Sequence, residues 1–126
     1  MPIVEPEVSI GSPERAEAEA ILLAELTKAL DSQGEGRVVI LKLTIPTIPN
    51  LYEPLVDHPR AARVVALSGG FSRDEACVEL NKNRGIIASF SRALLSDLRA
   101  DMSDGEFDAA LGAAIDQISD ASANKA

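Results

Sequence analysis

A lysine lies in the middle of an apolar stretch, and its side chain is the first candidate for chemistry in this chain. Lys42 is flanked by Val, Ile and Leu residues in the segment RVVILKLTIP, residues 37–46. The segment is rich in β-branched residues and ends at Pro46, so we expect a buried strand. An ammonium group without a partner is costly to bury, and the usual response is a lowered pKa. Two interpretations follow for Lys42, either a nucleophile or a structural lysine in an ion pair.

A pair of glutamates near the N-terminus provides a second group of reactive side chains. Glu5 and Glu7 lie two residues apart in the segment PIVEPEV, residues 2–8, which we expect to be a strand. Residues two apart on a strand share a face and lie about 7 Å apart along it. One of two neighbouring carboxylates tends to hold a proton near neutrality, which suits the acid and base steps of imine chemistry. The alternative is a pair of solvated charges at a strand end.

Two loops combine glycine, serine and arginine in patterns that suit an anion. Residues 66–72, ALSGGFS, indicate a strand end, two glycines and a helix start. Glycine lets backbone N–H groups approach a phosphate, and the N-terminus of the following helix favours negative charge. Residues 90–94, FSRAL, place an arginine beside a serine, and a guanidinium group can form a bidentate contact with phosphate. The candidate phosphate ligands are therefore Ser68, Gly69, Gly70, Ser91 and Arg92, although the first loop also fits an ordinary tight turn.

The remaining histidine and cysteine give no comparable pattern. His58 lies in a turn-like segment, and Cys77 lies on an expected helix, where packing suits it better than reactivity. No cluster has the spacing of metal ligands, so we expect neither a metal nor another cofactor. Because Cys77 is the only cysteine, no internal disulfide can form, which fits a reducing cytoplasm.

Length, charge and hydropathy narrow the class of protein. The chain has 126 residues, which suits one domain, and 46% of them are hydrophobic, enough for a core. A net charge of −8 and only three Phe and one Tyr argue against a nucleic-acid-binding surface. No apolar run approaches the ~18 residues of a membrane span, and no signal-peptide pattern opens the chain. We therefore expect a cytoplasmic protein with no nucleic-acid or membrane partner.

Hydrophobic periodicity predicts strands that alternate with helices. Ser12 followed by proline marks one helix start, and serine–glutamate capping boxes mark two more, at 72–75 and 103–106. The predicted strands are 2–8, 37–45, 63–70 and 85–91, and the predicted helices are 13–31, 72–82, 92–99 and 104–122, with a short helix at 51–56 and a frayed tail at 123–126. Apolar strands that alternate with helices predict an α/β fold with a parallel sheet.

Each predicted strand has one apolar face and one face that becomes polar toward its C-terminal end. We call the face that becomes polar the graded face. In the second strand it is formed by Val38, Ile40, Lys42 and Thr44. The same parity assigns these residues to the graded faces of the other strands: Ile3, Glu5 and Glu7; Val64, Ala66 and Ser68; Ile87, Ser89 and Ser91. An apolar face suits helix packing, and a graded face suits a barrel interior with an active site at its C-terminal mouth. A flat doubly wound sheet is the alternative, although no dinucleotide-binding fingerprint is present.

Four separate stretches resemble one enzyme family. PIVEPE, LKLTIP, RVVALSGGFSRDEA and IIASFSRALL are similar to strands five to eight of class I fructose-bisphosphate aldolases of the short bacterial type, in the same order and with fitting spacing. The resemblance covers essentially the whole chain. It implies the C-terminal half of a (β/α)8 barrel, with four parallel strands and helices on the outer face, and Schiff-base aldol chemistry without a metal.

The resemblance implies a role for each candidate residue. Lys42 matches the family's Schiff-base lysine, Glu5 matches its acid/base glutamate, and Glu7 would be a supporting carboxylate. The residues that match the family's phosphate site are Ser68, Gly69, Gly70, Ser91 and Arg92. The implied reaction is cleavage of fructose 1,6-bisphosphate to dihydroxyacetone phosphate and glyceraldehyde 3-phosphate, in glycolysis and gluconeogenesis. A Schiff-base enzyme acting on another ketose phosphate is an alternative.

The resemblance also concerns the extent of the chain. A whole barrel needs about 250 residues, and the family's first four strands have no counterpart here. Family members commonly have Val before PIVEPE, and a GTG codon can be read as Val or as a start, so we expect the reading frame to extend upstream of Met1. An open sheet would expose two edges and an inner face formed by Ile3, Ile40, Val64 and Ile87, at a cost on the order of 10 kcal/mol. We accordingly predict a homo-oligomer or a complementary half-barrel partner, with turnover far below that of a whole barrel. The alternative function is a half-barrel that binds sugar phosphate without catalysis.

Overall fold

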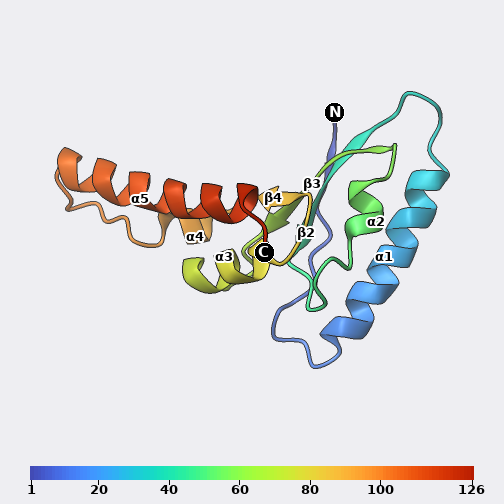
Figure 1. The fold of residues 1–126 in the computed structure, drawn as a ribbon, viewed down its shortest axis with the longest axis horizontal. Helices are drawn as coiled ribbons and strands as arrows, with labels where there is room; N and C mark the ends of the chain where they lie inside the picture. Colours follow the sequence, from blue (N-terminus) through green and yellow to red (C-terminus); the bar gives the residue numbers. More distant parts are fainter.

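Four strands form one parallel sheet in which each strand is hydrogen-bonded to the next along the chain. The computed structural model describes residues 1–126. The strand order is β1-β2-β3-β4, for strands Ile3–Val4, Val39–Thr44, Ala61–Leu67 and Ile86–Ala88. The helices are α1 Arg15–Asp31, α2 Glu53–Val56, α3 Arg73–Asn81, α4 Arg92–Leu95 and α5 Asp104–Ala123. The fold is therefore α/β with an all-parallel sheet, as the sequence predicts (Figure 1).

One face of the sheet forms the core together with the helices. In β2, Leu41 and Leu43 are almost fully buried, as the alternation of the sequence predicts. They belong to one apolar cluster with Leu30 of α1, Leu55 of α2 and Leu80 of α3. Each buried leucine contributes about 2 kcal/mol, so this face accounts for the attachment of the first three helices. Figure 1 shows α1 and α2 beside the strands, with α5 extending away from the β4 end of the sheet.

The register of β3 differs from the prediction. Leu41 and Leu43 of β2 are paired with Val64 and Ala66. Paired residues of neighbouring strands share a face, so Val64 and Ala66 lie on the helix-covered face, where both are buried. Their predicted place on the face of the candidate lysine is wrong. The sequence predicts Val64 and Ala66 on the face of the candidate lysine because Ser68 is polar and lies two residues after Ala66. Ser68 lies in the turn beyond β3, so it does not follow the alternation of the strand.

Several elements are shorter than predicted, and proline and local hydrogen bonds explain two of the differences. β1 contains only Ile3–Val4, because Pro6 has no N–H to continue the ladder. α1 begins at Arg15, and Ser12 accepts a hydrogen bond from the backbone N–H of Glu14 in the turn before the helix. The helix predicted to run to residue 99 ends at residue 95.

Both predicted capping boxes are present. Ser72 and Glu75 exchange hydrogen bonds at the start of α3, and Ser103 and Glu106 do so at the start of α5. These bonds hold the pKa of both glutamates below the ordinary value. The main cause is the hydroxyl of Ser72 for Glu75 and the backbone N–H of Ser103 for Glu106.

The two edges of the sheet differ. At the β1 edge, Ile3 and Val4 are 52% and 39% exposed. At the β4 edge, the hydroxyl of Ser122 in α5 accepts a hydrogen bond from the backbone N–H of Ala88 at 3.0 Å. The open edge expected at β4 is therefore partly covered by the chain's own C-terminal helix.

The C-terminal tail makes several hydrogen bonds, although the sequence predicts fraying from residue 123. Ala123 is the last residue of α5, and the backbone N–H of Ala126 donates to the carbonyl of Asn81 at the end of α3. The ammonium group of Lys125 donates to the carbonyls of Leu80 and Ala121. Burial lowers the pKa of this group below its ordinary value. None of the helices combines the length and the hydropathy that crossing a membrane requires.

Candidate active site

Residues from all four strand ends surround one small polar cavity of about 150 Å³. Because parallel strands place their carboxyl ends at one edge of the sheet, residues far apart in the sequence become neighbours there. The lining contains most of the residues that the sequence singles out, namely Glu5, Glu7, Lys42, Ser68, Gly69, Ser91 and Arg92, together with Leu67 and Ser89. Gly70 is the one predicted site residue outside this lining, next along the chain from Gly69.

Lys42 reaches the cavity from the more open face of the sheet. It forms one row with Val65 of β3 and Ile87 of β4, and all three side chains are only partly buried. The side chain of Lys42 is 25% exposed. Its aliphatic stem therefore lies on the apolar surface of the sheet, and the ammonium group reaches a solvent-accessible cavity.

The ammonium group of Lys42 donates a hydrogen bond to the carboxylate of Glu5. The distance from Nζ to Oε2 is 3.1 Å, and the side chain of Glu5 is 51% exposed. A partly solvated ion pair contributes about 0–1 kcal/mol, so it adds little to the stability of the fold. The contact agrees with the ion-pair interpretation of Lys42. It also places a proton acceptor against the amine, which a nucleophilic lysine requires.

Glu7 provides a second carboxylate at the same cavity. Its side chain is exposed and forms no ion pair. The four charged groups of the lining are Lys42 and Arg92 against Glu5 and Glu7, so their formal charges cancel. A phosphate that enters the cavity therefore meets two carboxylates as well as two cations, and this arrangement favours ligands that also bond to uncharged donors.

The glycine turn after β3 lies beside the cavity, with Gly69 in the lining. Gly69 and Gly70 have backbone φ angles of 62° and 101°, which residues other than glycine rarely adopt. A Cβ atom at Gly69 would lie 3.2 Å from the side chain of Ile10 and 3.6 Å from that of Thr44. Glycine is therefore needed at this position for both conformation and space.

Two residues at the start of α4, beyond the end of β4, also line the cavity. Ser91 precedes α4, and Arg92 is the first residue of that helix. The guanidinium group of Arg92 is exposed and forms no ion pair, so it is available to an anion. The sequence predicts both residues at this place.

A second, largely apolar cavity of about 440 Å³ adjoins the first and was not predicted. The two cavities share Lys42, Ser89 and Ser91. The apolar wall is formed by Ile87, Ala88, Phe90, Leu94, Ile115 and Ile118. Lys42 thus lies between a polar cavity and an apolar one.

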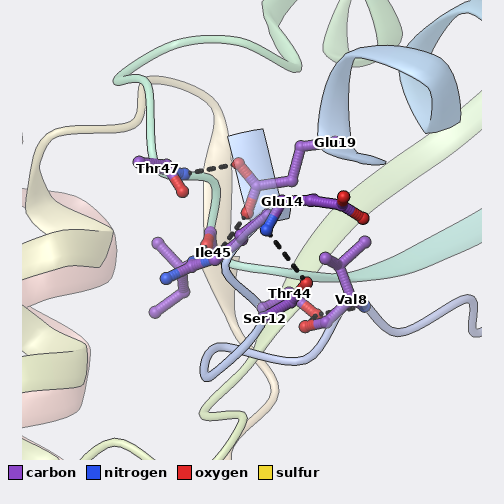
Figure 2. A network of polar contacts seen from close by, with 8 residues as sticks. Val8, Ser12, Glu14, Glu19, Thr44, Ile45 and Thr47 are labelled. Atoms are coloured by element: carbon purple, nitrogen blue, oxygen red, sulfur yellow. Dashed lines mark hydrogen bonds and ion pairs between the residues drawn. The ribbon is translucent and has the colours of Figure 1, made fainter. Parts of the chain in front are cut away.

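A buried hydrogen-bond network joins the start of α1 to the end of β2, and the sequence gives little sign of it. Glu19 is fully buried and accepts hydrogen bonds from Arg15 Nε and from the backbone N–H of Thr47, each at 2.7 Å. Arg15 also donates to the carbonyl of Ile45, and its guanidinium carbon lies 5.6 Å from the ring centre of Phe71. Figure 2 shows this junction between the start of α1 and the end of β2. The only sequence signal is the spacing of Arg15 and Glu19 by one helical turn.

The tyrosine hydroxyl near this network lacks a partner. Tyr52 is fully buried, and its hydroxyl is the one buried side-chain oxygen or nitrogen without a hydrogen bond. Burial, followed by the charge of Glu19, raises the pKa of Tyr52 well above its ordinary value. The phenol is therefore held in its neutral form.

The remaining candidates lie away from the cavity. Nε2 of His58 lies 3.1 Å from the carboxylate of Asp31, a partner that the sequence does not suggest. Cys77 is buried in the core, and burial raises the pKa of its thiol, so it is packed as predicted. No group of His, Cys, Asp and Glu side chains has the arrangement of a metal site. No known protein-family model matches the chain.

Proposed function

We propose that the chain is a Schiff-base aldolase of the class I fructose-bisphosphate type. The observation that supports this proposal most is the 3.1 Å contact between Lys42 Nζ and Glu5 Oε2, at a cavity that also contains a glycine turn and Arg92. A lysine nucleophile, an adjacent proton acceptor and an anion-binding loop are the three parts that imine chemistry on a phosphorylated ketone needs. The similarity of four stretches to that family adds to this argument.

In the proposed reaction, Glu5 first accepts a proton from the ammonium group of Lys42. The neutral amine attacks the C2 ketone of fructose 1,6-bisphosphate and forms a carbinolamine. A proton from the Glu5 carboxylic acid then assists loss of the hydroxyl group as water, which leaves an iminium ion. Glu7 supports these transfers as a neighbouring carboxylate.

The iminium ion withdraws electrons while the C3–C4 bond breaks. A base takes the proton of the C4 hydroxyl, and glyceraldehyde 3-phosphate leaves. Protonation of the remaining enamine at C3 and hydrolysis of the imine release dihydroxyacetone phosphate and return Lys42 to its starting state. The phosphate next to the ketone is held by Arg92 and by the loops that contain Ser68, Gly69, Gly70 and Ser91.

We further propose that the sheet is half of a (β/α)8 barrel. The accessible surface is 7166 Å², whereas a compact monomer of 13.3 kDa is expected to have about 6,450 Å². The excess fits a sheet with one incompletely covered face and an exposed β1 edge. Such an edge would pair with a further strand, from a second copy or from a complementary half.

The alternative is a domain that binds sugar phosphate without cleaving it. The ion pair between Lys42 and Glu5 is the observation that favours this alternative. An enzyme for another ketose phosphate is a second alternative, and a panel of phosphorylated ketoses separates it from the first.

Turnover of fructose 1,6-bisphosphate tests the proposal. Triose phosphate release is measured for the unmodified protein and for Lys42→Arg, Glu5→Gln and the control Lys28→Arg, which alters a lysine that is 80% exposed on α1. We expect activity in the unmodified protein and in K28R, none in K42R, and a loss of about 10²-fold or more in E5Q. Binding of the sugar phosphate by calorimetry without turnover in any variant would favour the binding domain instead.

A further inference from the structure

Thr44 links the two segments that hold the candidate acid and the candidate nucleophile. It lies two residues beyond Lys42 in β2, and the residue is only 2% exposed. Its hydroxyl oxygen accepts a hydrogen bond from the backbone N–H of Val8 and donates one to the carbonyl of the same residue, each at 3.0 Å. Figure 2 shows Thr44 beside Val8 in this arrangement. The hydroxyl group of Thr44 thus bonds both the backbone N–H and the backbone carbonyl of Val8, which lies outside the sheet.

The segment that contains Glu5 and Glu7 is not held to β2 by backbone hydrogen bonds, so a side-chain contact is needed to fix its position. The ladder between β1 and β2 ends with the pair Val4 and Leu41, and Pro6 cannot donate the next hydrogen bond. Val8 is where the chain is again bonded to β2, through Thr44 rather than through backbone. The two glutamates therefore lie between a ladder that ends before them and a side-chain contact that follows them.

Thr44 also lies near the glycine turn. Its methyl carbon lies 3.6 Å from the place that a Cβ at Gly69 would take, and Ile10, two residues after Val8, lies 3.2 Å from the same place. The side chain of Thr44, in the strand β2 that also carries Lys42, therefore lies between the segment that contains Glu5 and the turn that contains Gly69.

We propose that Thr44 is a positioning residue that holds Glu5 against the ammonium group of Lys42. The geometry of this inference rests on the two hydrogen bonds between Thr44 and Val8. Its catalytic consequence rests on the proposed Schiff-base function. Thr44 touches no reacting atom, so it acts through the segment it holds. A displacement of about 1 Å in a group that transfers protons can cost up to ~10²-fold in rate, which sets the scale of the expected effect.

The catalytic part is tested by the rate of imine formation with dihydroxyacetone phosphate, trapped by cyanoborohydride. Thr44→Val keeps the shape of the side chain and removes both hydrogen bonds, whereas Thr44→Ser keeps the hydroxyl. We expect T44V to slow trapping about tenfold or more and T44S to stay within about threefold of the unmodified protein. In the Glu5→Gln background, T44V should cause little further loss, because it acts through Glu5. If the trapping rate of the double variant T44V/E5Q falls by the product of the two single losses, the positioning role is overturned.

The geometric part is tested without reference to imine formation. Two quantities are measured in T44V, T44S and the unmodified protein: hydrogen exchange of the Val8 amide, and acetylation of Lys42 relative to the exposed Lys28. We expect T44V to raise Val8 exchange about tenfold and to make Lys42 more reactive, because both lose a partner, and we expect T44S to resemble the unmodified protein. Unchanged Val8 exchange and Lys42 acetylation in folded T44V would contradict the inference.

These measurements separate the two proposals. If the unmodified protein traps no ketone while T44V alters both Val8 exchange and Lys42 acetylation, the aldolase proposal fails and the positioning geometry stands. If T44V does not fold, T44S decides the question, because loss of Val8 protection with the hydroxyl still present would overturn the inference.

Discussion

Replacing Glu19 by alanine should destabilise the fold far more than replacing any exposed glutamate. Glu19 is fully buried and accepts two short hydrogen bonds, one from the guanidinium group of Arg15 and one from the backbone N–H of Thr47. A hydrogen bond to a charged group contributes about 1.5–3 kcal/mol, and removing one partner of a buried ion pair costs about 3–5 kcal/mol. Arg15 is 15% exposed and keeps its bond to Ile45, so we expect the lower end, about 3 kcal/mol.

The assay is unfolding in urea, followed by circular dichroism. With a total stability of about 5–15 kcal/mol, a loss of about 3 kcal/mol moves the midpoint clearly while the slope stays constant. The matched control is Glu17→Ala, an exposed glutamate on the same helix, which should change stability by no more than about 0.5 kcal/mol. A double-mutant cycle with Arg15→Met should give a coupling energy of about 1–3 kcal/mol. A change below about 0.5 kcal/mol in E19A, or equal effects of E19A and E17A, would refute this account of the junction.

Three further predictions concern the hydroxyl of Tyr52, the capping boxes and the phosphate site. Tyr52→Phe should leave the free energy of unfolding unchanged or raise it by up to about 1 kcal/mol, since it removes a buried hydroxyl that has no partner; a loss above about 1 kcal/mol in urea unfolding would show an unrecognised bond. The lowered pKa of Glu75 means that its carboxylate adds stability above the ordinary glutamate value of 4.5, and that this contribution disappears as the pH falls through the lower pKa of the folded state. Ser72→Ala should therefore lose more stability at pH 7 than at pH 3, and an equal loss at both pH values in urea titrations would contradict the capping assignment. Arg92→Ala should weaken binding of dihydroxyacetone phosphate about tenfold or more and binding of dihydroxyacetone much less, and equal weakening by calorimetry would indicate a folding effect instead.

Local patterns in the sequence are sufficient to predict the elements and much of the cavity. The alternation in β2 correctly separates the buried Leu41 and Leu43 from Lys42, because side chains of a strand alternate between faces. The capping boxes at Ser72 and Ser103 locate two helix starts, because their partners lie only three residues away. The meeting of Glu5 with Lys42 follows from parallel strands that are neighbours in the sheet.

The differences arise where long-range contacts decide the structure. Ser68 suggests the wrong face for β3, because the strand ends at Leu67 and Ser68 begins the following turn. Glu19 lies in the run AEAEA, which is typical of an exposed helix face, and only the return of the chain at Thr47 buries it. The cover that Ser122 provides for β4 joins residues 34 positions apart, and no local pattern indicates such a contact.

Reductive trapping tests the central claim, that Lys42 is a Schiff-base nucleophile, most directly. The protein is incubated with dihydroxyacetone phosphate and borohydride, and its intact mass and peptides are measured for the unmodified chain, K42R and K28R. We expect one reduced ligand per chain in the unmodified protein and in K28R, located on Lys42, and none in K42R. An absence of adduct in the unmodified protein at saturating ligand, or an adduct that persists unchanged in K42R, would contradict the account.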